Sequence, residues 1–299
     1  MKIGRIILNI IKKMQDKEII KRRKTYPNHN IFNERLDISY IDDNNPSHKF
    51  DLYYSKPGNK RNLLVIHIHG GSYMFGDKMD SYPLALEFLY EGFDFASVNY
   101  IVNDGRRDTL DLVKDCYTAI KYIVDHLTEL GISYNNIAIL GDSAGGHLAL
   151  LISEIINNEA LREQFKFDKI TTNLVATLLN CPVYDYEVSG YTMKRSGAIR
   201  MFGPSYFDKE HTKMLSPRTH IKEFNIPLFV STCKNDFLRN ESLLIKEDYL
   251  NKESKLELID LDVDDKNIGH VHNLVNPSLK ESKYINDNMI AFLVNLINQ

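Results

Sequence analysis

Gly141-Asp142-Ser143-Ala144-Gly145-Gly146 separates two different kinds of sequence pattern in this chain. The residues before it, Ile137 to Leu140, are apolar and partly β-branched, which is typical of a buried strand. The residues after it, His147 to Ile152, are typical of the first turns of a buried helix. A serine on such a sharp strand-to-helix turn needs nearly side-chain-free neighbours. The pattern therefore predicts Ser143 as a nucleophile, with helix N–H groups directed at its hydroxyl.

The composition is that of a soluble globular protein. Of the 299 residues, 43% are hydrophobic and 26% are charged, and the formal net charge is -3. A chain of this length can bury one large α/β core or two small ones. A slightly acidic balance gives no electrostatic reason to expect nucleic acid as a partner.

The cysteines argue against a disulfide framework. Cys116, Cys181 and Cys233 are odd in number, far apart and mostly in apolar runs, so their spacing indicates neither disulfides nor a zinc site. We expect small buried hydrophobic side chains in a reduced compartment, which predicts a cytoplasmic protein.

The N-terminal segment, residues 1–35, is predicted to be helical and part of a cap. Met1 to Lys24 is basic and amphipathic, with isoleucines at helical spacing. It lacks the apolar run and cleavage site of a secretory signal, and no segment of the chain is long enough to span a bilayer. The helix could pack on the body of the protein or lie on an anionic membrane surface, and we favour packing.

The rest of the chain alternates strand and helix patterns. Leu36–Ile41 and Phe50–Tyr54 flank a turn and predict an antiparallel hairpin, and Leu63–Ile68 reads as a strand buried on both faces. Further predicted strands are Phe93–Val98, Asn173–Leu179, Leu228–Thr232 and Leu256–Leu261, and predicted helices are Tyr82–Tyr90, Leu110–Leu130 and Tyr284–Ile297. This alternation predicts an α/β fold with a mainly parallel central sheet flanked by helices.

One stretch interrupts that alternation. Residues from about 182 to 225 hold no clean strand and are rich in aromatic residues and methionine. An insertion of this size is more often a lid than a plain loop, so we expect a small helical cap within a domain spanning 36–299. Apolar residues of this cap either line an entrance or pack on the body: Tyr184, Tyr186, Tyr191, Met193, Met201, Phe202, Tyr206 and Phe207.

A serine nucleophile also needs a base and a group that orients the base. For a serine on this kind of turn, the chain order is serine, acid, histidine. Asp236 follows the apolar run ending at Cys233, so it leaves the carboxyl end of a late strand, where ligands of an open sheet bind. A cap for the helix starting near Asn240 is the simpler role for Asp236, but its position favours the acid.

Two histidines occupy the place expected for the base. His270 and His272 follow the last predicted strand and precede the final helix. In an extended segment both imidazoles would project to the same side, so spacing alone does not separate them.

An oxyanion hole is predicted upstream. His69-Gly70-Gly71-Ser72 directly follows the Leu63–Ile68 strand, and small residues there let backbone N–H groups turn inward. The predicted donors are the N–H groups of Gly70, Gly71 and Ala144.

Taken together, these motifs resemble the hormone-sensitive-lipase-like branch of the α/β-hydrolases, which includes bacterial acetyl esterases and carboxylesterases. The resemblance rests on the stretch from His69 to Lys78, on the Ser143 motif, and on Asp236 and His270, and it runs from about Leu36 to the C-terminus. It implies that His270 is the base and His272 stands at an aromatic position of the family. Ser72 replaces the third glycine of the family's H-G-G-G motif, and Ile101 stands where the family usually has arginine.

The resemblance implies a serine esterase that cleaves small-molecule carboxylic esters, with short acyl chains as the most economical substrate and with no metal or organic cofactor. The same triad would serve an amidase, a peptidase or an aryl-formamide hydrolase. A non-catalytic binding protein on this fold is the contrasting hypothesis, and it gives no reason to retain Ser143, Asp236 and His270 together. Acyl-chain length, alcohol preference and oligomeric state are not determined by the sequence.

Overall fold

The computed structural model describes residues 25, 32–188, 193–249 and 252–298. In this part of the chain eight strands form one sheet, in the spatial order β1-β2-β4-β3-β5-β6-β7-β8. The strands are β1 Asn33–Ser39, β2 Lys49–Tyr54, β3 Leu64–Ile68, β4 Asp94–Val98, β5 Asn136–Asp142, β6 Asn173–Asn180, β7 Leu228–Cys233 and β8 Leu256–Leu261. Of the N-terminal segment 1–35 that was predicted to be helical, Met1 to Lys24 lie outside the described residues. Its last three residues are not helical, because β1 begins at Asn33 and pairs with β2.

The sheet is antiparallel at one edge and parallel elsewhere. Strand β2 pairs antiparallel with β1 and with β4. All other neighbouring strands are parallel, so the predicted hairpin and the predicted mainly parallel sheet are both confirmed. Every residue of β3 is buried, as expected for a strand with packing on both faces.

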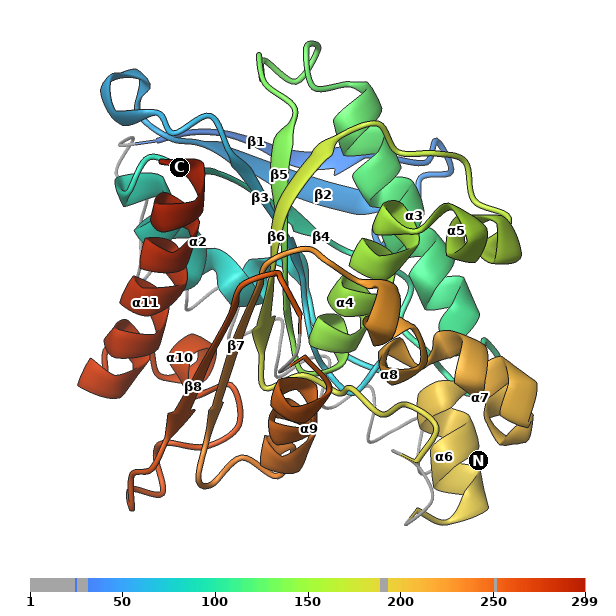
Figure 1. Ribbon diagram of the computed structural model, residues 1–299. Helices are drawn as coiled ribbons and strands as arrows, with labels where there is room; N and C mark the ends of the chain where they lie inside the picture. Colours follow the sequence, from blue (N-terminus) through green and yellow to red (C-terminus); the bar gives the residue numbers. More distant parts are fainter. Residues whose placement is uncertain (1–24, 26–31, 189–192, 250–251, 299) are drawn as a thin grey trace.

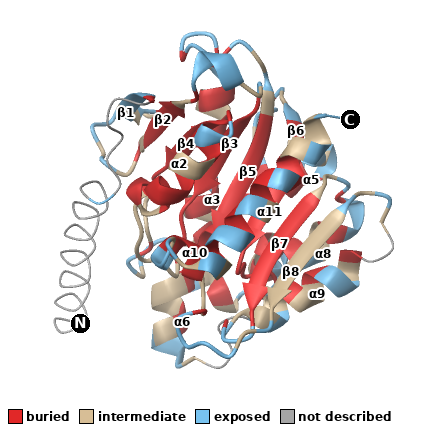
Figure 2. Cartoon of the chain, turned by 90° about the vertical axis from the view of Figure 1, so that its left-hand side faces the viewer, coloured by how far each residue is buried: buried red, intermediate tan, exposed pale blue. Residues whose placement is uncertain are grey.

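Helices cover both faces of the sheet (Figure 1). On one face, α2 Tyr82–Tyr90 and α11 Lys280–Ile297 pack over side chains such as Val65. On the other face, α3 Thr109–Asp125, α4 Ala144–Asn157 and α9 Arg239–Tyr249 contribute to a core that also includes Ile66. Consecutive β3 residues thus belong to opposite cores, and the buried strands lie between the two helical layers (Figure 2).

The stretch predicted as a cap is helical where it is described. After β6 come α6 Arg195–Phe202, α7 Lys209–Leu215 and α8 Pro217–His220, with 3-10 turns η3 Pro204–Phe207 and η4 Ile221–Glu223. The remaining short elements are α5 Glu159–Phe165, which the sequence pattern did not predict, α10 His272–Val275, η1 Pro57–Asn59 and η2 Lys78–Ser81.

Helix α3 ends at Asp125, five residues before the predicted end at Leu130. The carbonyl of Tyr122 accepts hydrogen bonds from both the backbone N–H of His126, at 3.1 Å, and its ring Nδ1, at 2.8 Å. The backbone bond belongs to the last turn of the helix, and the His126 ring adds a second donor to the same carbonyl at the point where the helix ends.

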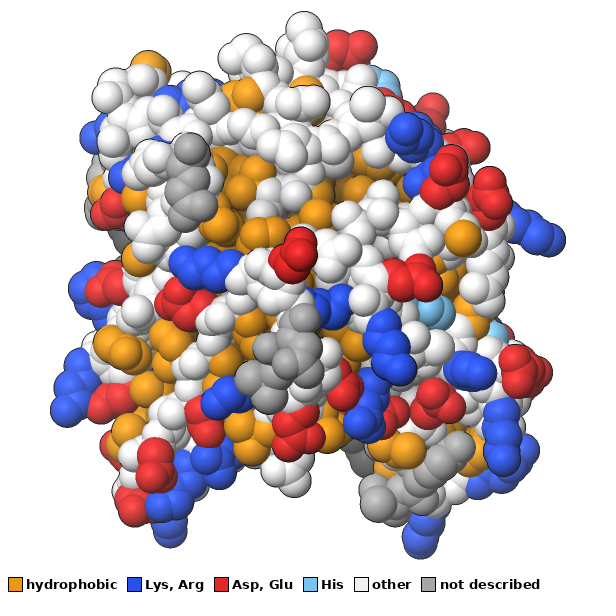
Figure 3. Space-filling model, viewed as in Figure 1, with side chains coloured by type: hydrophobic (Ala, Val, Ile, Leu, Met, Phe, Trp, Pro, Cys, Tyr) orange, Lys and Arg blue, Asp and Glu red, His pale blue; other side chains and the backbone are white. Residues whose placement is uncertain are grey.

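Charges of both signs are interspersed on the face of the molecule seen in Figure 3. None of the helices in the described ranges is both long enough and apolar enough to cross a bilayer.

Candidate active site

Ser143 lies at the tip of a strained turn between β5 and α4. Its backbone has φ 54° and ψ -121°, a conformation that non-glycine residues rarely adopt. Its N–H donates to the carbonyl of Asn180 at 2.9 Å, and its own carbonyl accepts from the N–H of Val183 at 3.2 Å. These two bonds fix the turn against the end of β6, so the strain is held by the surrounding fold.

The glycines on either side of Ser143 are required by close backbone approaches. A Cβ added to Gly145 would lie 2.2 Å from the carbonyl oxygen of Ile68, and one added to Gly141 would lie 2.2 Å from the carbonyl oxygen of Gly145. Neither backbone oxygen can move away without displacing β3 or α4. The steric reason inferred from the sequence for these glycines is therefore confirmed.

The structure brings Ser143, His270 and Asp236 together from three distant parts of the chain. His270 Nε2 lies 2.8 Å from Ser143 Oγ, and His270 Nδ1 lies 2.7 Å from Asp236 Oδ1. With the ring proton on Nδ1, that nitrogen donates to the carboxylate and Nε2 accepts from the serine hydroxyl. This is the hydrogen-bond relay of a serine nucleophile, a base and an orienting acid.

Asp236 is held as a carboxylate by its hydrogen bonds. Its side chain is fully buried, and burial alone would raise its pKa. Hydrogen bonds from His270, from the N–H of Leu238 at 2.9 Å and from Thr232 Oγ1 at 2.8 Å outweigh burial and hold the pKa of Asp236 below its usual range. The residue therefore keeps the negative charge needed to stabilise a protonated imidazole.

The two histidines do not share one direction, because the segment is not extended. Val271 between them adopts a left-handed conformation, with φ 49° and ψ 33°, and α10 begins at His272. His272 is buried, and its Nδ1 lies 3.1 Å from the carbonyl oxygen of Gly269. Of the two candidates, the structure places only His270 against Ser143.

Asp142, the residue directly before the serine, ties the turn to the loop after β3. Its carboxylate accepts from His67 Nε2 at 2.8 Å and from the backbone N–H of Gly70 at 3.0 Å. The second bond corrects the expectation for Gly70, whose N–H is directed at Asp142 and not at the space beside Ser143. Sequence reasoning missed this role because the contact depends on the pairing of β3 with β5.

Two predicted oxyanion donors have free N–H groups. The N–H groups of Gly71 and Ala144 donate to no backbone carbonyl within the described ranges. Gly71 has φ +115°, and a Cβ there would lie 2.4 Å from the carbonyl oxygen of Phe75, so only glycine fits this tight loop. His69 supports the loop because its ring stacks on Tyr100, with centroids 4.3 Å apart.

Aromatic side chains of the 182–225 segment pack on the body around a buried histidine. His147 on α4 stacks on Tyr186, with centroids 4.8 Å apart, and its Nε2 donates to the carbonyl of Leu215 at 2.7 Å. Burial lowers the pKa of His147 to about 4, so the ring is neutral at pH 7. The buried residues of this segment include Tyr184, Tyr186, Phe202 and Tyr206, whereas Met193, Met201 and Phe207 are partly buried and Tyr191 lies outside the described residues.

Phe237 is a residue of the site that the sequence analysis did not single out. Its side chain is 76% exposed although it directly follows Asp236. Its ring lies against His270, with centroids 4.2 Å apart and planes 38° apart. An exposed apolar ring thus lies beside the base.

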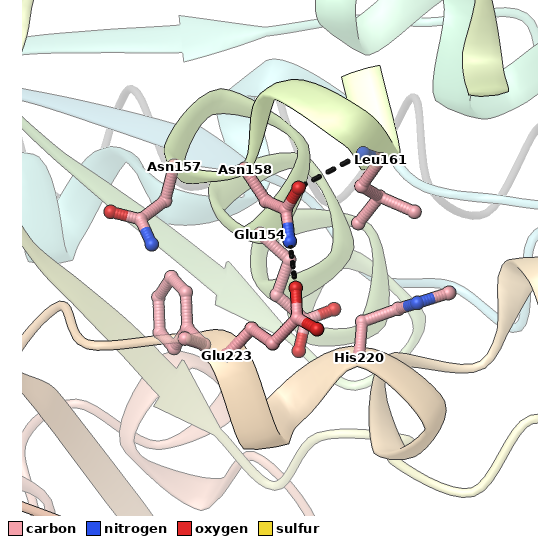
Figure 4. A pocket seen from close by; sticks show the side chains of 7 residues that line it. Glu154, Asn157, Asn158, Leu161, His220 and Glu223 are labelled. Carbon is pink, nitrogen blue, oxygen red and sulfur yellow. Dashed lines mark hydrogen bonds between the residues drawn. The ribbon is translucent and has the colours of Figure 1, made fainter. Parts of the chain in front are cut away.

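A pocket lies away from Ser143, between α4, α5 and η4 (Figure 4). Glu154 lines it and follows Ser143 by eleven residues of α4, which places it about 16 Å along the helix axis. Glu154 is buried, and neither of its carboxyl oxygens has a hydrogen-bond partner among the described residues. Burial raises the pKa of Glu154 well above its usual value, against a weaker opposing effect of Lys252.

This carboxyl group makes stability depend on pH. A raised folded-state pKa means that the folded protein retains a proton that the unfolded chain loses, so stability falls as pH rises above about 4.3. Each pH unit between the unfolded and folded pKa of Glu154 costs about 1.4 kcal/mol. We expect Glu154→Gln to melt above the wild type by several degrees at pH 8 and by less at pH 5.

Thermal melts of both proteins across this pH range measure the effect. Glu159→Gln is the matched control, because the Glu159 side chain is 78% exposed and lies on the next helix. If the difference in melting temperature between the wild type and Glu154→Gln were the same at every pH, Glu154 would not be the group that holds the proton.

The sequence matches the model of a known protein family. A family model described as BD-FAE matches residues 50–242, which is more than half of the chain. The chain belongs to the BD-FAE family. The matched region runs from the second residue of β2 past β7 and contains Ser143 and Asp236, whereas His270 lies beyond it.

Curated relatives of this BD-FAE chain are distant hydrolases. A putative alpha/beta hydrolase from Acanthamoeba polyphaga mimivirus is 23% identical over 75% of this chain and 65% of its own length. The probable carboxylic ester hydrolase LipM from Mycobacterium tuberculosis is 28% identical over 58% of this chain and 41% of its own length. The chain thus spans less than two thirds of the length of these relatives.

Solved structures of other proteins superpose on almost the whole chain. Esterase B from Lactobacillus rhamnosis superposes with a TM-score of 0.84 and 20% identity, covering 98% of this chain and 95% of that one. A bacterial heroin esterase gives a TM-score of 0.74 and 21% identity, covering 98% and 92%. The fold is that of the α/β-hydrolases, and the resemblance to the hormone-sensitive-lipase-like esterases is confirmed.

Proposed function

We propose that this protein is a serine hydrolase that cleaves small-molecule carboxylic esters with short acyl chains. The observation that carries the proposal is the position of His270, hydrogen-bonded to Ser143 Oγ through Nε2 and to Asp236 through Nδ1. The carboxylic ester hydrolase among its relatives supports the same reaction class.

In the proposed mechanism, His270 Nε2 takes the hydroxyl proton as Ser143 Oγ attacks the ester carbonyl. Asp236 stabilises the imidazolium through the 2.7 Å bond to Nδ1. The imidazolium then protonates the departing alcohol, which leaves an acyl group on Ser143. A water activated by His270 hydrolyses this acyl-enzyme and restores the serine.

The oxyanion is proposed to rest on the N–H groups of Gly71 and Ala144, which face no protein acceptor within the described residues. Gly70, predicted as a third donor, is instead assigned a positioning role, because its N–H is engaged by Asp142. Loss of one such donor typically lowers kcat by about a hundredfold or more.

Residues 182–225 are proposed to act as the cap over this site. The aromatic packing around His147 joins this segment to α4, directly behind Ser143. Short acyl groups are favoured because the comparable esterase B was solved with a tributyrin phosphonate inhibitor. Three buried free thiols support the proposal of a cytoplasmic location.

A series of p-nitrophenyl esters tests the proposal. We expect kcat/KM to be highest for acetate or butanoate and to fall toward octanoate, because a longer acyl chain needs more room beside Ser143 under the proposed cap. The matching amide, p-nitroacetanilide, should react more slowly because an amine is a poorer leaving group than a phenol. Release of p-nitrophenol at 400 nm measures the esters. A folded protein that hydrolyses none of them would refute the proposed function.

A further inference from the structure

Cys181 lies directly behind the candidate base. It follows β6 in a left-handed backbone conformation, with φ 50°, and its side chain is buried. Its Sγ accepts a hydrogen bond from the N–H of Val271 at 3.4 Å, and Val271 is the residue after His270. The thiol is therefore held against the loop that carries the imidazole.

Three different metal-binding groups converge at this point. Cys181 Sγ, a carboxylate oxygen of Asp236 and a ring nitrogen of His270 all lie within 4.8 Å of one another. Among the described residues, this is the one group of three such side chains whose spacing could hold a metal ion. Sulfur, imidazole nitrogen and carboxylate oxygen are the ligands that Zn²⁺ prefers, and catalytic zinc sites have three protein ligands with a fourth position left for water.

We propose that Cys181, Asp236 and His270 bind Zn²⁺ as an inhibitory ion that switches off the hydrolase. The inhibition rests on the proposed function, whereas the binding does not. Zinc–ligand bond lengths in a tetrahedral site require ligand atoms about 3.4 to 3.6 Å apart. Small side-chain shifts reach this spacing, since His270 Nδ1 and Asp236 Oδ1 start at 2.7 Å and all three groups lie within 4.8 Å.

Coordination at Nδ1 removes the base by changing the tautomer of His270. Nδ1 is the ring nitrogen that faces Asp236. When Nδ1 coordinates the ion through its lone pair, it carries no proton. The one remaining ring proton of the neutral imidazole then resides on Nε2, which faces Ser143 Oγ as a donor. Such a nitrogen cannot accept the serine proton, so Ser143 is not activated. The displaced thiol proton of Cys181 passes to solvent.

The surroundings of Asp236 suit it as a ligand. Thr232 Oγ1 and the N–H of Leu238 already hold its two carboxylate oxygens. Such outer hydrogen bonds orient a metal-binding carboxylate and raise the affinity of a site. They can persist when the ion replaces the proton between Asp236 and His270.

Cys233 provides a matched control. It is also buried and also touches the loop of the base, since its thiol donates to the carbonyl of Ile268 at 3.5 Å. It does not belong to the three-residue cluster. A zinc effect that depends on Cys181 and not on Cys233 therefore reports the proposed site and not general reactivity of buried thiols.

The test compares the full-length wild type with Cys181→Ala and Cys233→Ala, each freed of metal by a chelator. Zn²⁺ is titrated into the p-nitrophenyl acetate assay, and each rate is expressed relative to the same protein without metal. Equilibrium dialysis measures Zn²⁺ binding, and Co²⁺ replaces Zn²⁺ for absorption spectroscopy. We expect one ion bound, inhibition and a thiolate-to-cobalt charge-transfer band in wild type and Cys233→Ala. In Cys181→Ala the band should vanish and the inhibitory Zn²⁺ concentration should rise at least about tenfold.

Equal Zn²⁺ sensitivity of Cys181→Ala and the wild type, or a wild type without the cobalt band, would overturn the proposal. If Cys181→Ala does not fold, Cys181→Ser gives the same comparison with a nearly isosteric side chain that is a poorer zinc ligand. A wild type that shows the cobalt band but hydrolyses no ester would support the metal site and refute the proposed function. An active wild type that binds no Zn²⁺ would refute the metal site alone.

Discussion

Ser143→Ala is expected to lower kcat for p-nitrophenyl acetate by a factor on the order of 10⁵ or more. The substitution removes the oxygen that lies 2.8 Å from His270 Nε2, and no acyl-enzyme can form without it. What remains is the rate enhancement from binding and from the oxyanion donors, which is far smaller. Initial rates over a range of substrate concentrations measure the change, and circular dichroism verifies that the variant is folded.

Ser39→Ala is the control for this substitution, because Ser39 is exposed on the edge strand β1, away from the site. It should keep the wild-type rate. If Ser143→Ala retained more than a small fraction of the wild-type kcat, hydrolysis would take place at another group.

The second large effect is expected at His270 and not at His272. His270→Gln should lower kcat by a factor on the order of 10⁴ or more, because glutamine cannot take the proton from Ser143. His272→Gln should have a much smaller effect on kcat, because the His272 ring is buried and faces the carbonyl of Gly269. Steady-state kinetics of the two variants under identical conditions measure the difference.

Melting temperatures of the two variants control for damage to the fold, since a buried histidine can be needed for packing. Equal losses of kcat in two folded variants would mean that the loop rearranges during turnover. A larger loss for His272→Gln would transfer the role of the base to His272.

Much of the fold could be predicted because buried parallel strands are short apolar runs between helical patterns. The hairpin of β1 and β2, the strand β3 and the turn at Ser143 follow from local periodicity and glycine placement. Local patterns failed where a tertiary contact decides the outcome. Helix α3 ends at Asp125, where the His126 ring contacts the carbonyl of Tyr122, and periodicity alone does not record that contact.

The candidate site was predictable in its chain order and not in its finer contacts. Ser143, Asp236 and His270 each follow a strand, and the carboxyl ends of parallel strands meet at one edge of the sheet. The bond between Gly70 and Asp142 depends on β3 lying beside β5, with Ile68 opposite Gly141. Strand order and register of this kind cannot be obtained from residue spacing.

The position of Cys181 beside Asp236 and His270 also could not be predicted from residue spacing. From spacing alone it looked like a small buried hydrophobic residue, 55 positions before Asp236 in the sequence. Strand β6 pairs with β7 through contacts such as Asn180 with Ser231, and this pairing carries Cys181 to the end of the strand that precedes Asp236. A metal-binding set assembled across two strand ends leaves no spacing motif for sequence analysis to find.

The central claim is that His270 activates Ser143 as a nucleophile, and covalent labelling by a fluorophosphonate tests it most directly. Intact-mass spectrometry followed by peptide mapping measures the number and position of adducts. The relay of Asp236, His270 and Ser143 predicts one adduct per chain, on Ser143, in the wild type and none in Ser143→Ala. A folded wild type that remains unlabelled, or that carries its adduct on another residue, would contradict the claim.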